Sequence, residues 1–157
     1  MNNKIKGKEQ KMNNLIKLLD KNLEYIQHQI IEDTIYIYVK SIKEYPCCPY
    51  CGTTSKKVHS RYKRTFQDLP IQGLKVKIII NNRKMFCKND SCNHKTFSEK
   101  FKFINDKAKK TKRLEKEIIN ISLNMSSVAA SKYLSDNLTN VGKSTICALL
   151  KKRYSSY

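Results

Sequence analysis

Apolar and polar residues alternate along two neighbouring segments near the start of the chain, residues 23–31 and 34–42. In the second segment Ile35, Ile37 and Val39 would share one face, and the residues between them would share the other. A period of two residues is typical of a half-buried β-strand. Because two acidic residues separate the segments, the pattern predicts a β-hairpin.

Two further extended segments follow. Residues 56–67 are basic with interleaved apolar side chains, and residues 74–80 are the strongest strand candidate because β-branched residues cluster there. We expect Asp68-Leu69-Pro70 to turn the chain between them. Asn81-Asn82 would form a hairpin turn that returns the chain beside the earlier strands.

Beyond residue 105 the apolar residues recur at helical spacing. Ser126 and Gly142 stand where the N-caps of a second and a third helix would fall. We therefore expect three helices over residues 111–153. Their inward-facing residues would be Leu114, Ile118, Ile121 and Met125, then Val128, Ala130 and Leu134, then Ile146, Leu149 and Leu150.

The change of period predicts an α+β chain with two small modules. A β-rich, zinc-ribbon-like domain would be followed by a three-helix helix-turn-helix domain. The expected divisions are a disordered basic tail (1–14), a β-hairpin plus zinc-binding domain (15–104), a basic linker (105–110) and a helix-turn-helix domain (111–157).

The charge balance points to a polyanionic partner. The 157 residues include 32 Lys plus Arg against 13 Asp plus Glu, a formal net charge of +19. Nucleic acid fits such a balance better than a membrane surface. No run of 18 apolar residues and no apolar leader occurs, so we expect a cytoplasmic protein of bacterial type, nucleoid-associated when bound to DNA, with no membrane partner.

Four cysteines form two short pairs, Cys48-x2-Cys51 and Cys87-x4-Cys92. Paired thiolates on two loops supply the four soft ligands that a tetrahedral Zn²⁺ takes at about 2.3 Å. Four thiolates leave no open position, so the predicted zinc is structural. Such a site would stabilise a small fold by about 10 kcal/mol or more in apparent terms.

Other candidate ligands lie close by in the sequence. Cys47 could take the place of Cys48, although Cys48-Pro-Tyr-Cys51 has the tighter spacing of a metal knuckle. His94 is a weaker rival for the second pair, and its alternative is an ordinary surface histidine. Cys147 falls in the third predicted helix and is not counted as a ligand.

Two groups of residues are candidates for binding DNA. The basic strand offers phosphate contacts, and its alternative is a solvated edge that discourages aggregation. The last helix would read bases with its first residues and bind phosphates with its last ones, and its alternative is a packing module. The candidates are Lys56, Lys57, His59, Arg61, Lys63 and Arg64 in the strand, and Lys143, Ser144, Thr145, Lys151, Lys152 and Arg153 in the helix.

The segment Gly142-Lys143-Ser144-Thr145 also resembles the end of a phosphate-binding P-loop. That motif needs a glycine five positions before Gly142, where this chain has Asn137, and it needs a hydrophobic strand directly upstream. We therefore exclude nucleotide binding.

Together these motifs resemble the N-terminal half of a bacterial insertion-sequence transposase of the ISL-three family. The resemblance covers about residues 15–153, including the helix-turn-helix with Ser144-Thr145. The matching segments are Cys48-Pro49-x-Cys51-Gly52, Val58-His59-Ser60-Arg61-Tyr62-x-Arg64, Asp68-Leu69-Pro70 and Phe86-Cys87-x4-Cys92, with Phe97 and Glu99 after them.

The resemblance implies sequence-specific binding of double-stranded DNA at the terminal inverted repeats of an insertion sequence. In the family a separate ribonuclease-H-like domain cuts and joins DNA with three carboxylates and divalent metal ions. No such triad is recognisable here, so we expect a truncated portion that is not an enzyme. A second copy of the chain and a full-length transposase are further candidate partners. The alternative is a stand-alone zinc-ribbon regulator or a module that binds RNA or protein.

Overall fold

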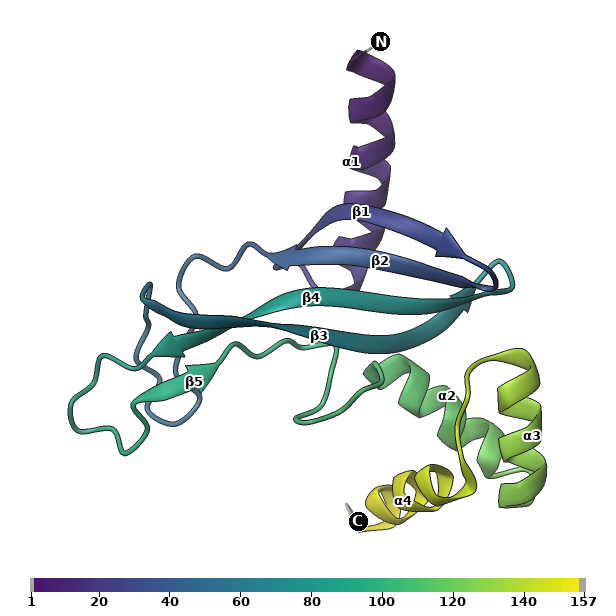
Figure 1. Ribbon diagram of the computed structural model, residues 1–157. Coiled ribbons are helices and arrows are strands. Elements are labelled where there is room, and N and C mark those ends of the chain that lie inside the picture. The colour runs from purple at the N-terminus through teal and green to yellow at the C-terminus, as the bar shows by residue number, and fades with distance from the viewer. Residues whose placement is uncertain (1, 156–157) are drawn as a thin grey trace.

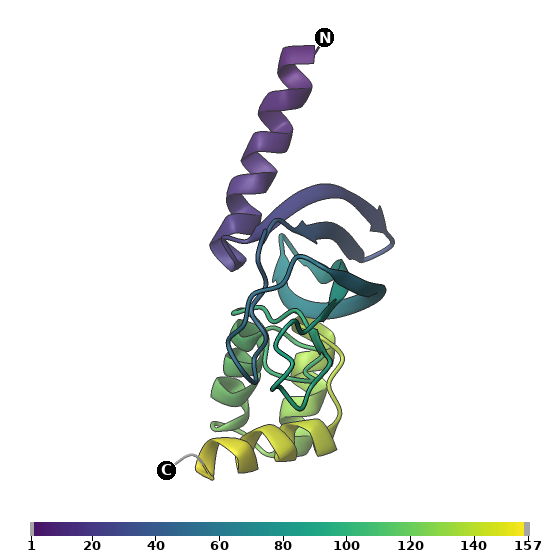
Figure 2. The same cartoon turned by 90° about the vertical axis from the view of Figure 1, so that its left-hand side faces the viewer.

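The computed structural model describes residues 2–155, with side-chain environments from residue 10 onward. Within that part it is a mixed α/β protein with five strands and four helices (Figure 1). One twisted sheet forms the centre. Helix α1 projects from one side of this sheet, and the other three helices gather on the opposite side (Figure 2).

The sheet has the order β1-β2-β4-β3, and the short β5 pairs with the far end of β4. Strands β2 and β4 are parallel, and the other pairs are antiparallel. The chain therefore leaves β2, passes through a long loop, and enters the sheet again through β3. The strands are β1 (Leu23–Ile31), β2 (Thr34–Ser41), β3 (Val58–Ile71), β4 (Leu74–Phe86) and β5 (Thr96–Ser98).

The β1–β2 hairpin is confirmed, but both predicted turns in the next segment are wrong. Strands β3 and β4 are joined at Gln72-Gly73, where both residues have positive φ (50° and 80°). Pro70 lies within β3 beside a register shift, a place where a sheet tolerates proline. Asn82 lies inside β4. Its side chain is fully buried and donates to the Tyr62 hydroxyl at 2.8 Å.

One face of the sheet carries the main hydrophobic core. Residues of β2, β3 and β4 pack there against Ile16 of α1 and against the segment that follows β5. Phe66 lies edge-to-face on Phe103, with ring centroids 5.6 Å apart. Phe101 and Phe103, which follow β5, therefore belong to the main core. The buried members of this core include Leu23, Ile37, Val39, Phe66, Ile78, Ile80, Phe101 and Phe103.

Helix α1 spans Asn2–Leu19, where we expected a disordered tail over residues 1–14. Two contacts anchor its second half to the sheet. Ile16 is buried in the main core, and the Asn13 side chain accepts a hydrogen bond from the backbone N–H of Tyr25 at 2.7 Å. An anchored end lets a helix propagate along residues whose own propensity is modest. Residue 1 lies outside the described residues.

Helices α2 (Lys112–Ser122), α3 (Ser127–Asn137) and α4 (Lys143–Tyr154) enclose a second core. Ser126 caps α3 as predicted, and Gly142 occupies the N-cap position of α4. Two of the predicted inward residues are misplaced, because Met125 falls in a turn and Val128 is 62% exposed. The buried members are Leu114, Ile118, Ala130, Leu134, Val141 and Ile146.

The segment 105–110, expected as a basic linker, runs along the edge strand β3. The Gln67 N–H donates to the Lys109 carbonyl at 2.8 Å, and the Thr111 N–H donates to the Gln67 carbonyl at 2.9 Å. Burial lowers the pKa of Lys110. The helices are therefore hydrogen-bonded to the sheet. Over the described residues, no helix has the length and apolar character needed to cross a membrane.

Candidate metal centre and nucleic-acid interface

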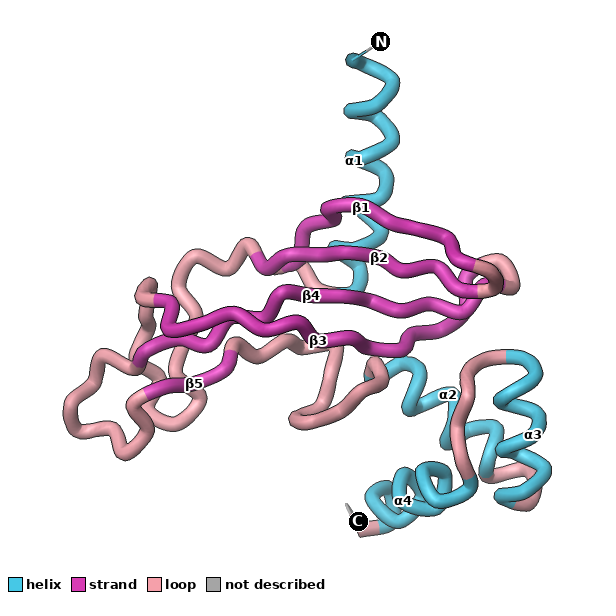
Figure 3. Tube along the Cα trace, in the orientation of Figure 1, coloured by secondary structure: helices cyan, strands magenta, loops and turns pink. Residues whose placement is uncertain are grey.

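Four sulfur atoms converge at one end of the sheet. The ligand atoms of Cys48, Cys51, Cys87 and Cys92 all lie within 4.8 Å of one another. The first pair lies in the β2–β3 loop and the second in the β4–β5 loop, which meet at the same end (Figure 3). Sulfurs at about 2.3 Å from a tetrahedral zinc stand about 3.8 Å apart. The Cys51–Cys87 sulfur separation of 3.5 Å is close to that spacing.

The first pair lies on a tight knuckle. The Cys48 N–H donates to the Thr53 carbonyl, and the Gly52 N–H donates back to the Cys48 carbonyl, both at 2.9 Å. Gly52 has φ of 75°, a conformation that favours glycine. This turn brings both sulfurs of the pair to the same side, and the positive φ at Gly52 explains why glycine stands directly after Cys51.

The second pair is held by the end of β4 and its loop. The Cys87 N–H donates to the Lys95 carbonyl at 2.9 Å, so Cys87 continues the pairing of the strands. Asn89 then turns the chain, because its carbonyl accepts from the Cys92 N–H at 3.0 Å and its side chain accepts from the Ser91 N–H. The longer four-residue spacing thus contains a complete turn.

A small apolar cluster encloses the sulfurs. Met85 and Phe97 are almost completely buried beside Cys48 and Cys92, and Val58 packs against them. All four ligands are cysteine, so a bound metal would have no open position for a substrate. The donor set and the enclosure are those of a structural Zn²⁺ site.

The thiols of the cluster differ in pKa. Hydrogen bonds from the Thr53 side chain and backbone lower the pKa of Cys51 to about 6. A backbone hydrogen bond from Asn89 lowers the pKa of Cys87, but desolvation and the neighbouring cysteines outweigh it and raise the value to about 12. Because crowded thiolates repel one another, some of these cysteines keep their protons while no cation is bound. Metal binding neutralises the thiolates and therefore releases protons.

The rival ligands lie outside this group. Cys47 is exposed, and its sulfur lies 3.9 Å from the Tyr45 carbonyl. His94 stacks on Tyr50, with ring centroids 3.4 Å apart and planes 15° apart. Cys147 lies in α4. Over the described residues, the cysteines that cluster are the four predicted ones.

A buried ion pair beside the metal centre was not predicted. Arg83 of β4 donates to both oxygens of the Glu99 carboxylate at 2.9 Å. Ser41, at the end of β2, also donates to Glu99 at 2.5 Å, and Arg83 reaches the Lys43 carbonyl at 2.7 Å. The Glu99 side chain is 1% exposed. This network connects residues near the ends of β2, β4 and β5, at the base of the cysteine loops. Nothing in the spacing of the sequence indicated that Arg83 would pair with Glu99.

The basic strand divides between the two faces of the sheet, since side chains alternate along a strand. Lys63 lies in a hollow with Tyr38 and Ile79 on one face. Tyr62 and Arg64 line a cleft on the other face. The predicted cations therefore do not form one surface. Arg61 and Lys63 alternate with Tyr62 and Arg64. His59 lies at a register shift of the strand, where its ring contacts Phe86, and Lys56 and Lys57 precede the strand.

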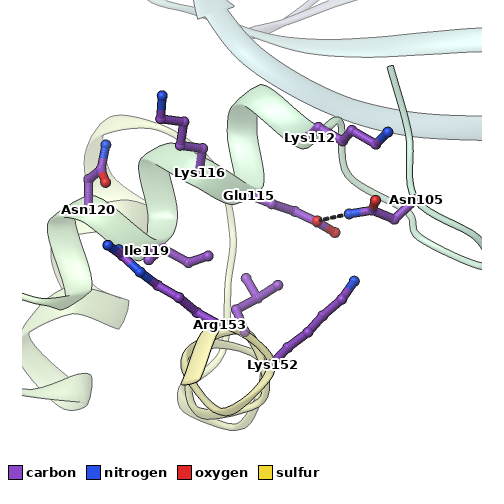
Figure 4. Close-up of a pocket in the computed structure, with 9 residues that line it drawn as sticks. Asn105, Lys112, Glu115, Lys116, Ile119, Asn120, Lys152 and Arg153 are labelled. Carbon is purple, nitrogen blue, oxygen red and sulfur yellow. Dashed lines mark hydrogen bonds between the residues drawn. The ribbon is translucent and has the colours of Figure 1, made fainter. Parts of the chain in front are cut away.

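The helical candidates lie at both ends of α4. Lys143, Ser144 and Thr145 are exposed at its first turn. Lys152 and Arg153 lie at its other end and line a cleft of about 330 Å³ with α2 (Figure 4). Lys112 and Lys116 of α2 stand at the same cleft, and Ile119 and Leu149 are among its apolar lining residues. Glu115 is engaged there by Asn105 at 2.7 Å.

The cysteine knuckles and the paired strands between them define a zinc ribbon. Residues 44–92 match the family model described as the zinc-finger of transposase IS204/IS1001/IS1096/IS1165. The matched residues include all four clustered cysteines and the whole of β3 and β4. No curated protein and no solved structure gives a match. The protein therefore contains a transposase-type zinc finger.

Proposed function

We propose that the protein binds double-stranded DNA sequence-specifically, at the terminal inverted repeats of an insertion sequence, as part of a transposase. The observation that carries the proposal is a transposase-type zinc finger in a chain of net charge +19. Excess cations displace the counterions condensed on DNA, a source of affinity for any DNA sequence. Specificity requires a second element that contacts bases.

In this proposal helices α3 and α4 form that element, which is a helix-turn-helix. Ser131 of α3 donates to the Val141 carbonyl at 2.8 Å, which holds the turn before α4. Ile146 is fully buried against the other two helices, so the opposite face of α4 is presented to solvent. A recognition helix contacts base edges with its first residues. Lys143, Ser144 and Thr145 take that role here.

Cations at other places would contact phosphates. Lys151, Lys152 and Arg153 form the last turn of α4, and Arg61 and Lys63 lie on the exposed part of β3. A zinc ion held by the four cysteines would keep the loops beside β3 rigid, and the contacts along β3 hold the helices in place. The two groups of cations would therefore meet the duplex at a fixed separation. In this proposal the chain recognises DNA and takes no part in phosphoryl transfer.

The test is a comparison of duplexes at fixed salt. Fluorescence anisotropy would measure binding of zinc-loaded protein to the inverted repeats that flank its gene, and to a scrambled duplex of the same composition. We expect at least tenfold tighter binding to the repeat, a conservative threshold because specific binding usually exceeds non-specific binding by about 10³ to 10⁷. Equal affinities for the two duplexes would contradict sequence-specific recognition.

A further inference from the structure

The face of the sheet that carries Tyr62 and Arg64 has a cleft beside the zinc knuckle. Its volume is about 380 Å³, within the range of about 300–1,000 Å³ that is usual for small-ligand sites. Tyr50 of the first cysteine knuckle and Tyr62 of β3 both line it. We propose that this cleft receives an unpaired nucleotide of the bound DNA. This inference rests on the proposed DNA-binding function.

The two tyrosines offer prearranged stacking surfaces. Tyr50 is 59% exposed, and the stack on His94 supports one face of its ring. Tyr62 is 39% exposed, and two hydrogen bonds fix its hydroxyl: it donates to Ser98 at 3.0 Å and accepts from Asn82 at 2.8 Å. Aromatic rings stack on bases of any sequence, and a fixed ring loses little freedom when a base binds.

Cations line the same cleft. The Arg64 guanidinium is fixed 4.6 Å from the Phe66 ring centroid, and Lys84, Lys100 and Lys107 also line the cleft. Of the two carboxylates there, Asp106 pairs with Lys100 at 2.5 Å, and Glu99 is engaged by Arg83. A hydrogen bond from Lys100, with the charges of Lys100, Arg64 and Lys107, lowers the pKa of Asp106. The remaining positive charge suits a phosphate next to a stacked base.

The cleft lies on a path from the helices to the metal centre. Asn105 lines both this cleft and the cleft between α2 and α4. Cations therefore follow one another from Lys152 and Arg153 of α4, past Asn105, to Lys107 and Arg64. A strand that follows this path would meet Tyr62 and then Tyr50. A paired base is already stacked within its duplex, so only an unpaired base can enter between these side chains.

The experiment uses the full chain loaded with zinc. The probes are a blunt DNA duplex, the same duplex with one unpaired 2-aminopurine nucleotide, and single-stranded RNA of matching sequence. We expect the unpaired DNA to bind about tenfold more tightly than the blunt duplex, with quenching of 2-aminopurine fluorescence. Tyr62→Ala should remove both the preference and the quenching, while affinity for the blunt duplex stays within twofold.

The control variant is Tyr133→Ala, which removes from α3 a tyrosine whose exposure (46%) lies between those of Tyr62 and Tyr50, and which should keep the preference. Tyr50→Ala tests the opposite wall and should also reduce the preference, which keeps the proposal testable if Tyr62→Ala fails to fold. Duplex binding with no preference for the unpaired nucleotide would overturn this inference alone, as would tighter binding of the RNA. Failure to bind any DNA would overturn the proposed function as well.

Discussion

The hydroxyl of Thr111 donates a 2.6 Å hydrogen bond to the carboxylate of Asp68, and both residues are buried. Thr111 is the N-cap of α2, and its hydroxyl also accepts from the Leu114 N–H. Arg113 donates to both oxygens of the same carboxylate. One aspartate of the edge strand therefore fixes the first turn of the helical module. We had expected Asp68-Leu69-Pro70 to be a turn, so this role was missed.

Asp68→Asn should destabilise the protein. The substitution removes the charge from the acceptor of three hydrogen bonds and places amide hydrogens against the donors of Arg113. Hydrogen bonds to charged groups contribute about 1.5–3 kcal/mol, so we expect a loss of about 2 kcal/mol in the free energy of unfolding. Urea unfolding monitored by circular dichroism measures it. Asp136→Asn, at an exposed position of α3, is the control, and equal stabilities of the two variants would argue against an anchoring role.

Removal of the metal should unfold the end of the sheet that holds the cysteines. Elemental analysis should find one zinc per chain, and a strong chelator should remove it together with much of the thermal stability. Cys92→Ser should lose the metal, because it deletes one of four ligands. Cys47→Ser should retain one zinc, because Cys47 is exposed and outside the cluster. A full complement of zinc in Cys92→Ser would show that another residue completes the site.

The two ends of α4 should respond differently to alanine substitution. Lys143→Ala should weaken binding to the cognate repeat more than to scrambled DNA, because we propose a base contact for this residue. Lys151→Ala should weaken binding to both and reduce the salt-dependence slope by about 0.9, as expected for one phosphate contact. Anisotropy titrations at several salt concentrations separate the two effects. Equal losses on both DNAs for Lys143→Ala would refute a base-reading role.

The buried pair of Arg83 and Glu99 should be sensitive to the loss of one partner. Glu99→Ala leaves the guanidinium of Arg83 buried without its carboxylate, which costs about 3–5 kcal/mol. The double variant Arg83→Met/Glu99→Met should recover a large part of that loss, because no unpaired charge remains. Chemical denaturation measures both. Asp33→Asn, which disrupts an exposed pair with Lys75, should leave the melting temperature nearly unchanged.

Local patterns predicted those parts of the protein that neighbouring residues determine. The alternation of residues 23–42 was sufficient for the β1–β2 hairpin, and the cap residues Ser126 and Gly142 marked where α3 and α4 begin. The cysteine spacing identified four sulfurs that the structure brings together. The predicted turn at Asn81-Asn82 was wrong because pairing with β3 and burial of the Asn82 side chain overrode the local preference for a turn.

The sequence by itself determined the change from strand to helix, the excess of positive charge and the identity of the clustered cysteines, because each depends on residue type and short-range spacing. Only the tertiary structure decided that Asp68 holds α2, that Arg83 pairs with Glu99, and that Tyr50 lies at the same cleft as Tyr62. These partners are separated along the chain and meet only when the sheet has formed. Their pairing is a property of strand order and register, and neither is encoded in any short segment.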